Sequence, residues 1–190
     1  FEGEDFTEVE GPEYQRGDVR DRASLDSAFE GAEAVIHLAA KISIVGDRDG
    51  SVWETNVTGA RNVAEAALAA NVKRLVHTSS CHAFNINDGA ELVDETAGRP
   101  GPRYPAYDRS KAAGEAEVRK VIERGLDAVV VNPSGIIGPN DPEPSRMGRT
   151  LLNVASGRLP GLIDGGFDWV DVRDVCEGVL LALERGRTGE

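Results

Sequence analysis

The feature that most constrains the fold is an alternation of short apolar runs, typical of β-strands, with longer segments whose apolar residues recur at helical spacing. The predicted strands cover residues 14–19, 33–39, 73–78 and 127–132. The predicted helices between them cover residues 24–30, 51–70 and 107–124. Strands and helices that alternate in this way form right-handed crossovers and a parallel sheet covered on both faces. The sequence therefore predicts an α/β fold with a doubly wound parallel sheet.

The pattern changes beyond residue 140. Connections rich in Pro and Gly surround two further predicted helices, 145–156 and 173–185, and Gly186 is the stop signal of the second. We therefore expect one domain over residues 1–140 and part of a second, smaller lobe over residues 141–190.

Composition excludes several classes of function. The net charge of −12 is spread along the chain and argues against nucleic-acid partners, because binding phosphates needs clustered Lys and Arg. Cys81 and Cys176 are the only cysteines, too few for a disulfide framework and without the spacing of a zinc site. No apolar run reaches the roughly 20 residues of a spanning helix, and no signal segment is seen at the start. We therefore expect a cytoplasmic protein without a metal site and without membrane contact.

Tyr107 and Lys111 lie four residues apart in a predicted helix, so a phenol and an ammonium share one helical face. A free phenol has a pKa of about 10. A cation fixed nearby favours the phenolate and brings that pKa toward the working range of a general acid or base. The pair therefore predicts a tyrosine that transfers protons.

Two predicted strands deliver further polar groups to the same place. The run 75–80 ends in hydroxyls at Thr78, Ser79 and Ser80, and the run 126–132 is followed by a predicted loop at residues 133–139. The carboxyl ends of parallel strands meet at one edge of the sheet, where open α/β folds bind ligands. We therefore expect the Ser80 hydroxyl, the Tyr107 phenol and the Lys111 ammonium to converge there.

Taken together, these motifs resemble the extended short-chain dehydrogenase/reductase family over essentially the whole chain. The segments that carry the resemblance are Gly17–Asp21, Val35–Ala40, Asn56 within Thr55–Gly59, Thr78–Ser80, Tyr107 with Lys111, and Asn132–Gly135. The resemblance implies a Rossmann-type sheet and an enzyme that uses NAD or NADP.

The resemblance also implies roles for individual residues. Ser80 would bind the substrate oxygen, Tyr107 would transfer its proton, and Lys111 would hold the nicotinamide ribose and favour the phenolate. The Asp18 carboxylate would accept a hydrogen bond from the adenine amine, and backbone near Pro133 would meet the carboxamide. The full set of expected cofactor contacts is Asp18, Val19, Leu38, Ala39, Ala40, Asn56, Thr78, Tyr107, Lys111, Pro133 and Ile136.

One element of the family pattern is missing. The family opens with a strand, a Gly-x-x-Gly-x-x-Gly turn and a helix before its adenine-binding Asp, whereas only 17 residues precede Asp18. That turn holds the pyrophosphate at a helix N-terminus. We therefore expect that the first βαβ unit, and part of the C-terminal lobe, lie outside this chain, and that the chain alone binds dinucleotide poorly.

The expected partner is a small-molecule substrate, and one position bears on its class. Nucleotide-sugar epimerases of the family commonly carry an Arg where this chain has Phe167, and that guanidinium grips a diphosphate. Residues 157–186 resemble the dihydroflavonol 4-reductase-like subgroup instead. We therefore expect reduction of an apolar ketone or aldehyde. Two alternatives stay open. The first is a nucleotide-sugar epimerase or dehydratase with tightly bound NAD, in which the diphosphate is bound instead by Arg146, Arg149 or Arg158. The second is a catalytically silent NAD(P)-binding sensor.

Several residues also have a purely structural interpretation. His37, on an apolar strand, is expected in the core. Asn56 is expected either to contribute to the cofactor site or only to form hydrogen bonds with the backbone. Ser79 is the alternative to Ser80 as the hydroxyl that binds the substrate oxygen. His82 either lines the substrate pocket or has only a loop role, and Tyr104 is a candidate for the wall of that pocket. By analogy with the family, the long helices 51–70 and 107–124 imply a homodimer.

Overall fold

Three parallel strands form the main sheet, in the spatial order β1 (Ala34–His37), β2 (Arg74–Thr78) and β3 (Ala128–Val131). The structure is a computed structural model that describes residues 13–86, 92–142, 144–158, 161 and 164–190. The β1–β2 register places His37 opposite His77, and the β2–β3 register places Thr78 opposite Val131. The predicted parallel α/β fold is confirmed.

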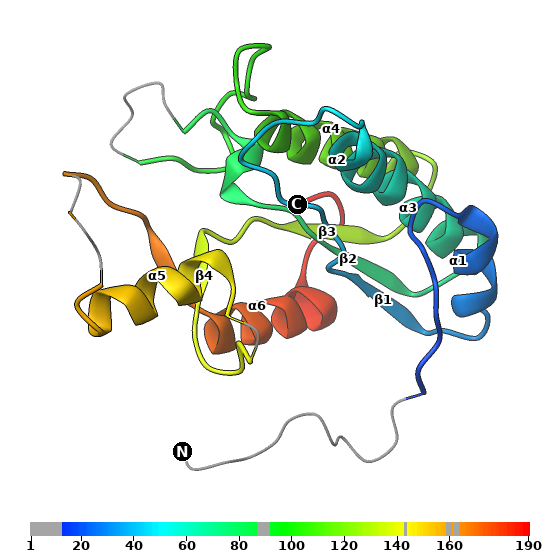
Figure 1. Cartoon of the computed structure of the whole chain (residues 1–190). Coiled ribbons are helices and arrows are strands. Elements are labelled where there is room, and N and C mark those ends of the chain that lie inside the picture. The colour runs from blue at the N-terminus through cyan, green and yellow to red at the C-terminus, as the bar shows by residue number, and fades with distance from the viewer. Residues whose placement is uncertain (1–12, 87–91, 143, 159–160, 162–163) are drawn as a thin grey trace.

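Helices cover one face of this sheet (Figure 1). They are α2 (Ser51–Trp53), the π-helical turn η1 (Glu54–Thr58), α3 (Gly59–Ala69) and α4 (Ala106–Ile122), with α1 (Arg22–Ala28) beside α3. Elements α2, η1 and α3 are consecutive and together correspond to the predicted helix 51–70. The only departure from that prediction is the wider π turn in the middle of the helix.

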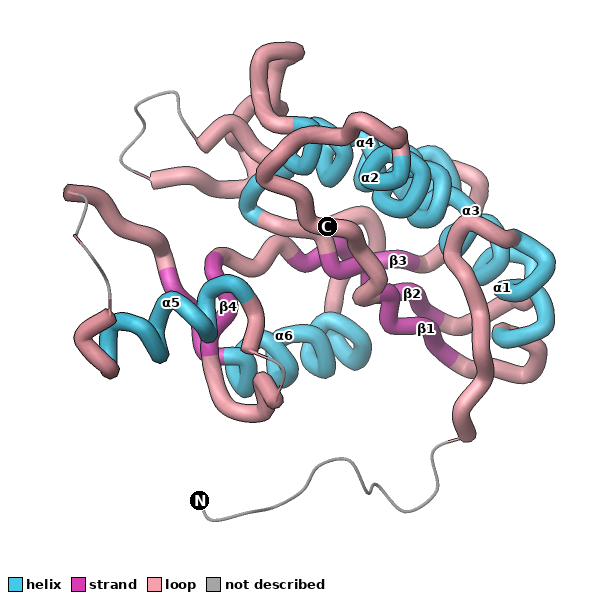
Figure 2. Tube along the Cα trace, viewed as in Figure 1, coloured by secondary structure: helices cyan, strands magenta, loops and turns pink. Residues whose placement is uncertain are grey.

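Helix α6 (Val172–Arg185) covers the opposite face, so the sheet lies between two helical layers (Figure 2). The guanidinium of Arg74 on β2 fixes this helix, because it donates to the carbonyl oxygens of Ala182 and Leu183 at 3.3 and 3.1 Å. The same guanidinium pairs with Asp127 at 2.9 Å. The sheet is therefore doubly wound, as the sequence predicts.

A second, two-stranded parallel sheet joins β4 (Gly135–Ile137) to β5 (Trp169–Asp171), with α5 (Arg146–Ala155) between them in the chain. The short 3₁₀ helix η2 (Cys81–Ala83) follows β2. The expected boundary at residue 140 and the expected homodimer stay predictions. Residues 1–12 of the expected first domain, and positions 159, 160, 162 and 163 of the expected lobe, lie outside the described residues.

Two expectations about strands are wrong. Residues 14–17 are irregular and Asp18 opens a turn, closed by a hydrogen bond from the Asp21 amide to the Asp18 carbonyl at 2.9 Å. Within the described ranges, β1 pairs with β2 alone, so the apolar residues of this segment have no neighbouring strand.

Residues 135–137 form a strand where a loop is predicted, because β5 supplies a pairing partner from far along the chain. Gly135 allows that contact, since a Cβ atom there would lie 2.9 Å from the ring of Trp169.

The contact between η1 and α4 depends on small residues. Ala60 and Ala64 are completely buried, and at Gly114 a Cβ atom would lie 2.3 Å from the carbonyl oxygen of Asn56. Real structures essentially never contain so short a contact, so the backbone of α4 approaches the π turn only because residue 114 has no side chain.

Two buried imidazoles lie side by side on the α4 side of the sheet. The rings of His37 and His77 are 5.1 Å apart, and their side chains are almost fully buried. Burial, with a smaller contribution from the Lys111 charge, lowers the pKa of His37 to about 4. Burial also lowers the pKa of His77. The expectation that His37 is a core residue is confirmed.

Among the described residues, no helix combines the length and the apolar character that crossing a membrane requires.

Substituting Gly114 with Ala is expected to destabilise the fold by about 1–3 kcal/mol, because the added methyl group forces α4 away from the Asn56 carbonyl. Gly178→Ala in α6 is the matched control, since a Cβ atom there meets nothing within 4 Å. That control is expected to be neutral or stabilising by up to about 1 kcal/mol. Urea unfolding of both variants measures the difference, and equal stabilities would contradict the packing described for Gly114.

The His37 pKa predicts a loss of stability in acid. An imidazole that is neutral in the fold and has a pKa of about 6.5 when unfolded stabilises the protein fully above that pH. This contribution is lost as the pH falls from 6.5 toward 4, and amounts to about 3 kcal/mol. Unfolding free energies at pH 7.5 and 4.5 should show it, and His37→Phe should reduce the dependence while the part due to the buried His77 remains. A His37 ring that titrates near pH 6.5 by NMR would contradict this expectation.

Candidate active site

Helix α4 brings the predicted phenol and ammonium to the carboxyl end of β2. The Lys111 Nζ atom donates to the carbonyl oxygen of Thr78, the last residue of β2, at 3.0 Å. The Tyr107 side chain lies close enough to Ser80, two residues beyond that strand, for the Ser80 hydroxyl to act on its pKa. The structure thus places Ser80, Tyr107 and Lys111 together, as the motif spacing predicts.

Ser80 sits at the start of η2 and is nearly buried, with 8% of its surface exposed. Its Oγ atom accepts a hydrogen bond from the His82 amide at 3.2 Å and so caps that short helix. Ser79 is buried as well, but its Oγ atom has no partner among the described residues. Since Ser80, not Ser79, contacts Tyr107, the geometry favours Ser80 over its rival.

The Lys111 ammonium is unusual because it is almost fully buried. Burial lowers its pKa to about 8, although the Glu115 carboxylate opposes that shift. Lys111 is therefore still mostly charged at neutral pH, but it titrates within the range in which enzymes work.

The pKa of Tyr107 is raised, which is the opposite of the direction expected from its spacing to Lys111. Burial penalises the phenolate and is the largest cause, and the Ser80 hydroxyl opposes it only in part. The Lys111 ammonium is directed at the Thr78 carbonyl. In this structure Tyr107 is accordingly a protonated phenol at neutral pH.

Asn56 lies in the π turn and clamps the backbone beyond β1. Its side chain accepts from the Lys41 amide at 2.7 Å and donates to the Lys41 carbonyl at 3.0 Å. It also donates to Ser110 on α4 at 2.9 Å, and the Ser110 hydroxyl donates to the Tyr107 carbonyl at 2.7 Å. Asn56 therefore joins the loop after β1 to the helix that carries Tyr107. π turns of this kind frequently occur at functional sites.

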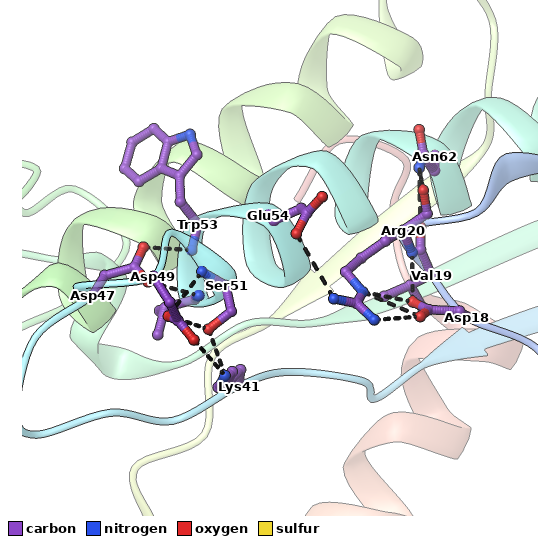
Figure 3. Close-up of polar contacts among 11 residues, drawn as sticks. Asp18, Val19, Arg20, Lys41, Asp47, Asp49, Ser51, Trp53, Glu54 and Asn62 are labelled. Carbon is purple, nitrogen blue, oxygen red and sulfur yellow. Dashed lines mark hydrogen bonds and ion pairs between the residues drawn. The ribbon is translucent and has the colours of Figure 1, made fainter.

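Asp18 and Val19 lie apart from this cluster, in the turn before α1. The Asp18 carboxylate is held by Arg20, whose Nη2 atom lies 2.7 Å away, and this hydrogen bonding lowers the Asp18 pKa to about 2 (Figure 3). Asn62 on α3 donates to the Val19 carbonyl at 3.0 Å. Arg20 contacts both oxygens of this carboxylate through its backbone amide, Nε and Nη2, so an adenine amine at Asp18 would compete with Arg20.

The other expected cofactor contacts line the same edge of the sheet. Leu38 is 66% exposed, and Ala39 and Ala40 are exposed beside it at the end of β1. The Pro133 carbonyl accepts from the Cys81 amide at 3.0 Å, and Ile136 lies on β4 with 43% of its surface exposed.

This open edge fits a dinucleotide. A row of small and apolar residues ends β1, and the buried Thr78 Oγ1 atom has no partner among the described residues. No group of three or more His, Cys, Asp or Glu side chains that suits a metal ion occurs in the described part of the chain.

His82 and Tyr104 lie beside this cluster. The His82 ring packs edge-on against Tyr107, with ring centroids 5.8 Å apart, and its Nδ1 atom is 3.3 Å from a carboxylate oxygen of the buried Asp108. The Tyr104 hydroxyl donates to Asn85. His82 therefore adjoins the phenol, whereas Tyr104 is engaged with the chain beyond η2.

A cavity of about 190 Å³ lies elsewhere, between β4 and α5. Ile136 is the only expected site residue that lines it. The phenol and ammonium lie outside this cavity, so it is not the candidate active site.

The sequence interpretation missed Glu115, Arg99 and Ser110, which contact the backbone or the partners of the site residues. Glu115 is buried one helical turn beyond Lys111 and pairs with Arg99 at 2.8 Å. Its spacing of four residues from Lys111 was visible in the sequence and is the signal that identifies it. No comparable signal exists for Arg99, which approaches from a loop.

Comparison with known proteins agrees with this geometry. The model of the NAD dependent epimerase/dehydratase family matches residues 3–190. Sterol demethylase protein B of Methylococcus capsulatus is 41% identical over 189 residues, which cover 98% of this chain and 57% of that protein. A putative dihydroflavonol 4-reductase of Synechocystis is 34% identical over 90% of this chain and 50% of its own.

A solved structure is also similar. A double mutant of the dTDP-glucose 4,6-dehydratase DesIV from Streptomyces venezuelae, with NAD bound, superposes with a TM-score of 0.77 at 30% identity, over 92% of this chain and 55% of that one. The chain thus spans about half the length of the relatives it matches. Structural neighbours have been crystallised with NAD or NADPH, and the chain belongs to the NAD dependent epimerase/dehydratase family.

Proposed function

We propose that the intact protein is an NAD(P)-dependent oxidoreductase that reduces a ketone or aldehyde. The observation that carries this proposal is the meeting of Tyr107, Ser80 and the buried Lys111 ammonium at the end of β2. A phenol, a hydroxyl and an ammonium at one strand end suit proton transfer to a substrate oxygen.

In the proposed reaction, Ser80 donates a hydrogen bond to the carbonyl oxygen and orients it. Tyr107 gives its proton to that oxygen as the carbonyl is reduced, and Lys111 stabilises the phenolate that remains. A bound nicotinamide supplies the hydride. The raised pKa of Tyr107 suits this direction, because the phenol is in its acid form at neutral pH.

The proposed cofactor contacts follow the two ends of the open edge. Asp18 and Val19 bind the adenine, the end of β1 at Leu38–Ala40 meets the middle of the dinucleotide, and Asn56 holds the loop beside it. Thr78, Tyr107 and Lys111 hold the nicotinamide ribose, and backbone at Pro133 and Ile136 meets the carboxamide.

We propose an apolar substrate. Phe167 and Trp169 form an exposed aromatic pair with ring centroids 5.3 Å apart, at the position where sugar-nucleotide enzymes commonly carry an Arg. The Gly135 amide donates to the carbonyl of Asp168, between these two residues, at 2.9 Å, and Pro133, two residues before Gly135, accepts from the Cys81 amide, so the backbone of the pair is joined to the segment that follows Ser80. The names of two relatives, sterol demethylase protein B and dihydroflavonol 4-reductase, agree with an apolar ring compound.

Tyr107→Phe is expected to lower turnover by about 10²- to 10⁴-fold, because it removes only the hydroxyl that transfers the proton. The measurement is NADH and NADPH oxidation by the full-length protein against a panel of carbonyl compounds. Tyr104→Phe is the matched control, since it removes a phenolic hydroxyl that contacts Asn85 instead, and it should retain turnover.

Three outcomes decide between the candidates. Turnover that Tyr107→Phe abolishes supports the reductase. Conversion of a UDP- or dTDP-sugar without net oxidation of NAD(P)H replaces it with an epimerase or dehydratase, the class to which the structural neighbour DesIV belongs. Tight NAD(P) binding without any turnover, and an unchanged cellular role of Tyr107→Phe, replaces it with a sensor.

Phe167→Ala is expected to raise KM for an apolar carbonyl substrate about tenfold with little change in kcat, because the ring contributes binding rather than chemistry. Leu180→Ala removes an equally exposed apolar side chain from α6 and is the control. A variant Phe167→Ala with unchanged KM would remove the aromatic pair from the substrate site.

A further inference from the structure

Glu115 is one of the most deeply buried side chains in the described structure, with 1% of its surface exposed. Its two carboxylate oxygens have different partners. Asn132, at the end of β3, donates to Oε1 at 2.5 Å, and Arg99, from the loop before α4, lies 2.8 Å from Oε2. A buried carboxylate is costly unless it is paired and hydrogen-bonded, so the carboxylate is held in one geometry.

Both partners of Glu115 also hold the segment that contains Ser80. The Asn132 amide donates a second hydrogen bond to the Ser80 carbonyl at 3.0 Å. Arg99 donates to the Ala83 carbonyl at 3.1 Å, and its guanidinium lies 4.5 Å from the centre of the Phe84 ring. The beginning and the end of the segment 80–84 are therefore tied, through two side chains, to one carboxylate on α4.

The same carboxylate acts on Lys111, one helical turn earlier. Its negative charge raises the pKa of Lys111 against the effect of burial. The other charged or titratable groups that act on Lys111 from packed elements are His37 on β1 and His77 on β2, both neutral at neutral pH because burial lowers their pKa values. Glu115 therefore supplies a favourable charge one helical turn from Lys111.

We propose that Glu115 is a positioning residue for the reaction, which holds the Ser80 segment through Asn132 and Arg99 and stabilises the ammonium form of Lys111. The catalytic part of this role rests on the proposed function. In this role Glu115 touches neither substrate nor cofactor. It acts on Ser80 through Asn132 and Arg99, and on Lys111 through its charge. The Glu115 side chain thereby links the position of the Ser80 hydroxyl to the charge of the Lys111 ammonium.

Glu115→Gln in the full-length protein tests the charge, because the amide keeps the size of the side chain. Lysine labelled with ¹³C at Cε reports the titration of Lys111 by NMR, and Lys111→Arg assigns its signal. We expect the Lys111 midpoint to fall by about one pH unit, and the alkaline limb of kcat/KM to move with it. Glu117→Gln, on the same helix and paired with the exposed Lys120, is the control and should change neither.

Asn132→Ser tests the link to Ser80 and leaves the Glu115 charge in place. We expect kcat to fall about tenfold to a hundredfold, because the Ser80 carbonyl loses its donor. Glu115 Oε1 loses a donor too, but its negative charge remains, so the Lys111 midpoint should move much less than in Glu115→Gln. Far-ultraviolet circular dichroism and the melting temperature establish that each variant is folded.

The proposal is overturned if Glu115→Gln leaves the Lys111 midpoint unchanged, or if both variants lower kcat merely in proportion to their loss of folded protein. The titration needs no turnover. A protein that reduces no carbonyl compound would therefore reject the proposed function, while the NMR midpoint would still decide whether Glu115 controls the charge of Lys111.

Discussion

The hydrogen bond from the buried Lys111 ammonium to the Thr78 carbonyl is the interaction on which the candidate site depends. It joins α4 to the last residue of β2, and so fixes where Tyr107 lies relative to the hydroxyls that follow the strand. Burying an ammonium is unfavourable, and the lowered pKa of Lys111 is the measure of that cost. The Glu115 charge and the Thr78 carbonyl offset this cost.

Close approach of backbones makes this arrangement possible. The π turn at Asn56 reaches α4 at Gly114, and the Asn56 side chain continues to Ser110 and Lys41. A single helix therefore receives contacts from the loop after β1, from the end of β2 and from the end of β3. In a parallel α/β sheet these three chain segments meet at the same edge, so one helix is able to organise the whole site.

Much of this was accessible from the sequence. The alternation of apolar runs and helical periodicity predicted β1, β2, β3 and the helices between them, and the spacing of Tyr107 and Lys111 predicted a shared helical face. The failures have one cause. Residues 14–19, predicted as a strand, have no neighbour to pair with in the described chain, whereas residues 135–137 have breaker residues nearby and still pair with 169–171. Local propensity does not report whether a pairing partner exists.

The sequence by itself determined the order of the three main strands and the helices between them, and the residue types at the end of each strand, because these follow from periodicity and spacing along the chain. Its motifs indicated the family by resemblance. Only the tertiary structure decided the electrostatics. The direction of the Tyr107 pKa, the pairing of Glu115 with Arg99 and Asn132, and the choice of Ser80 over Ser79 depend on burial and on contacts between segments distant in the chain. Desolvation is a property of the packed site, and spacing along one helix does not contain it.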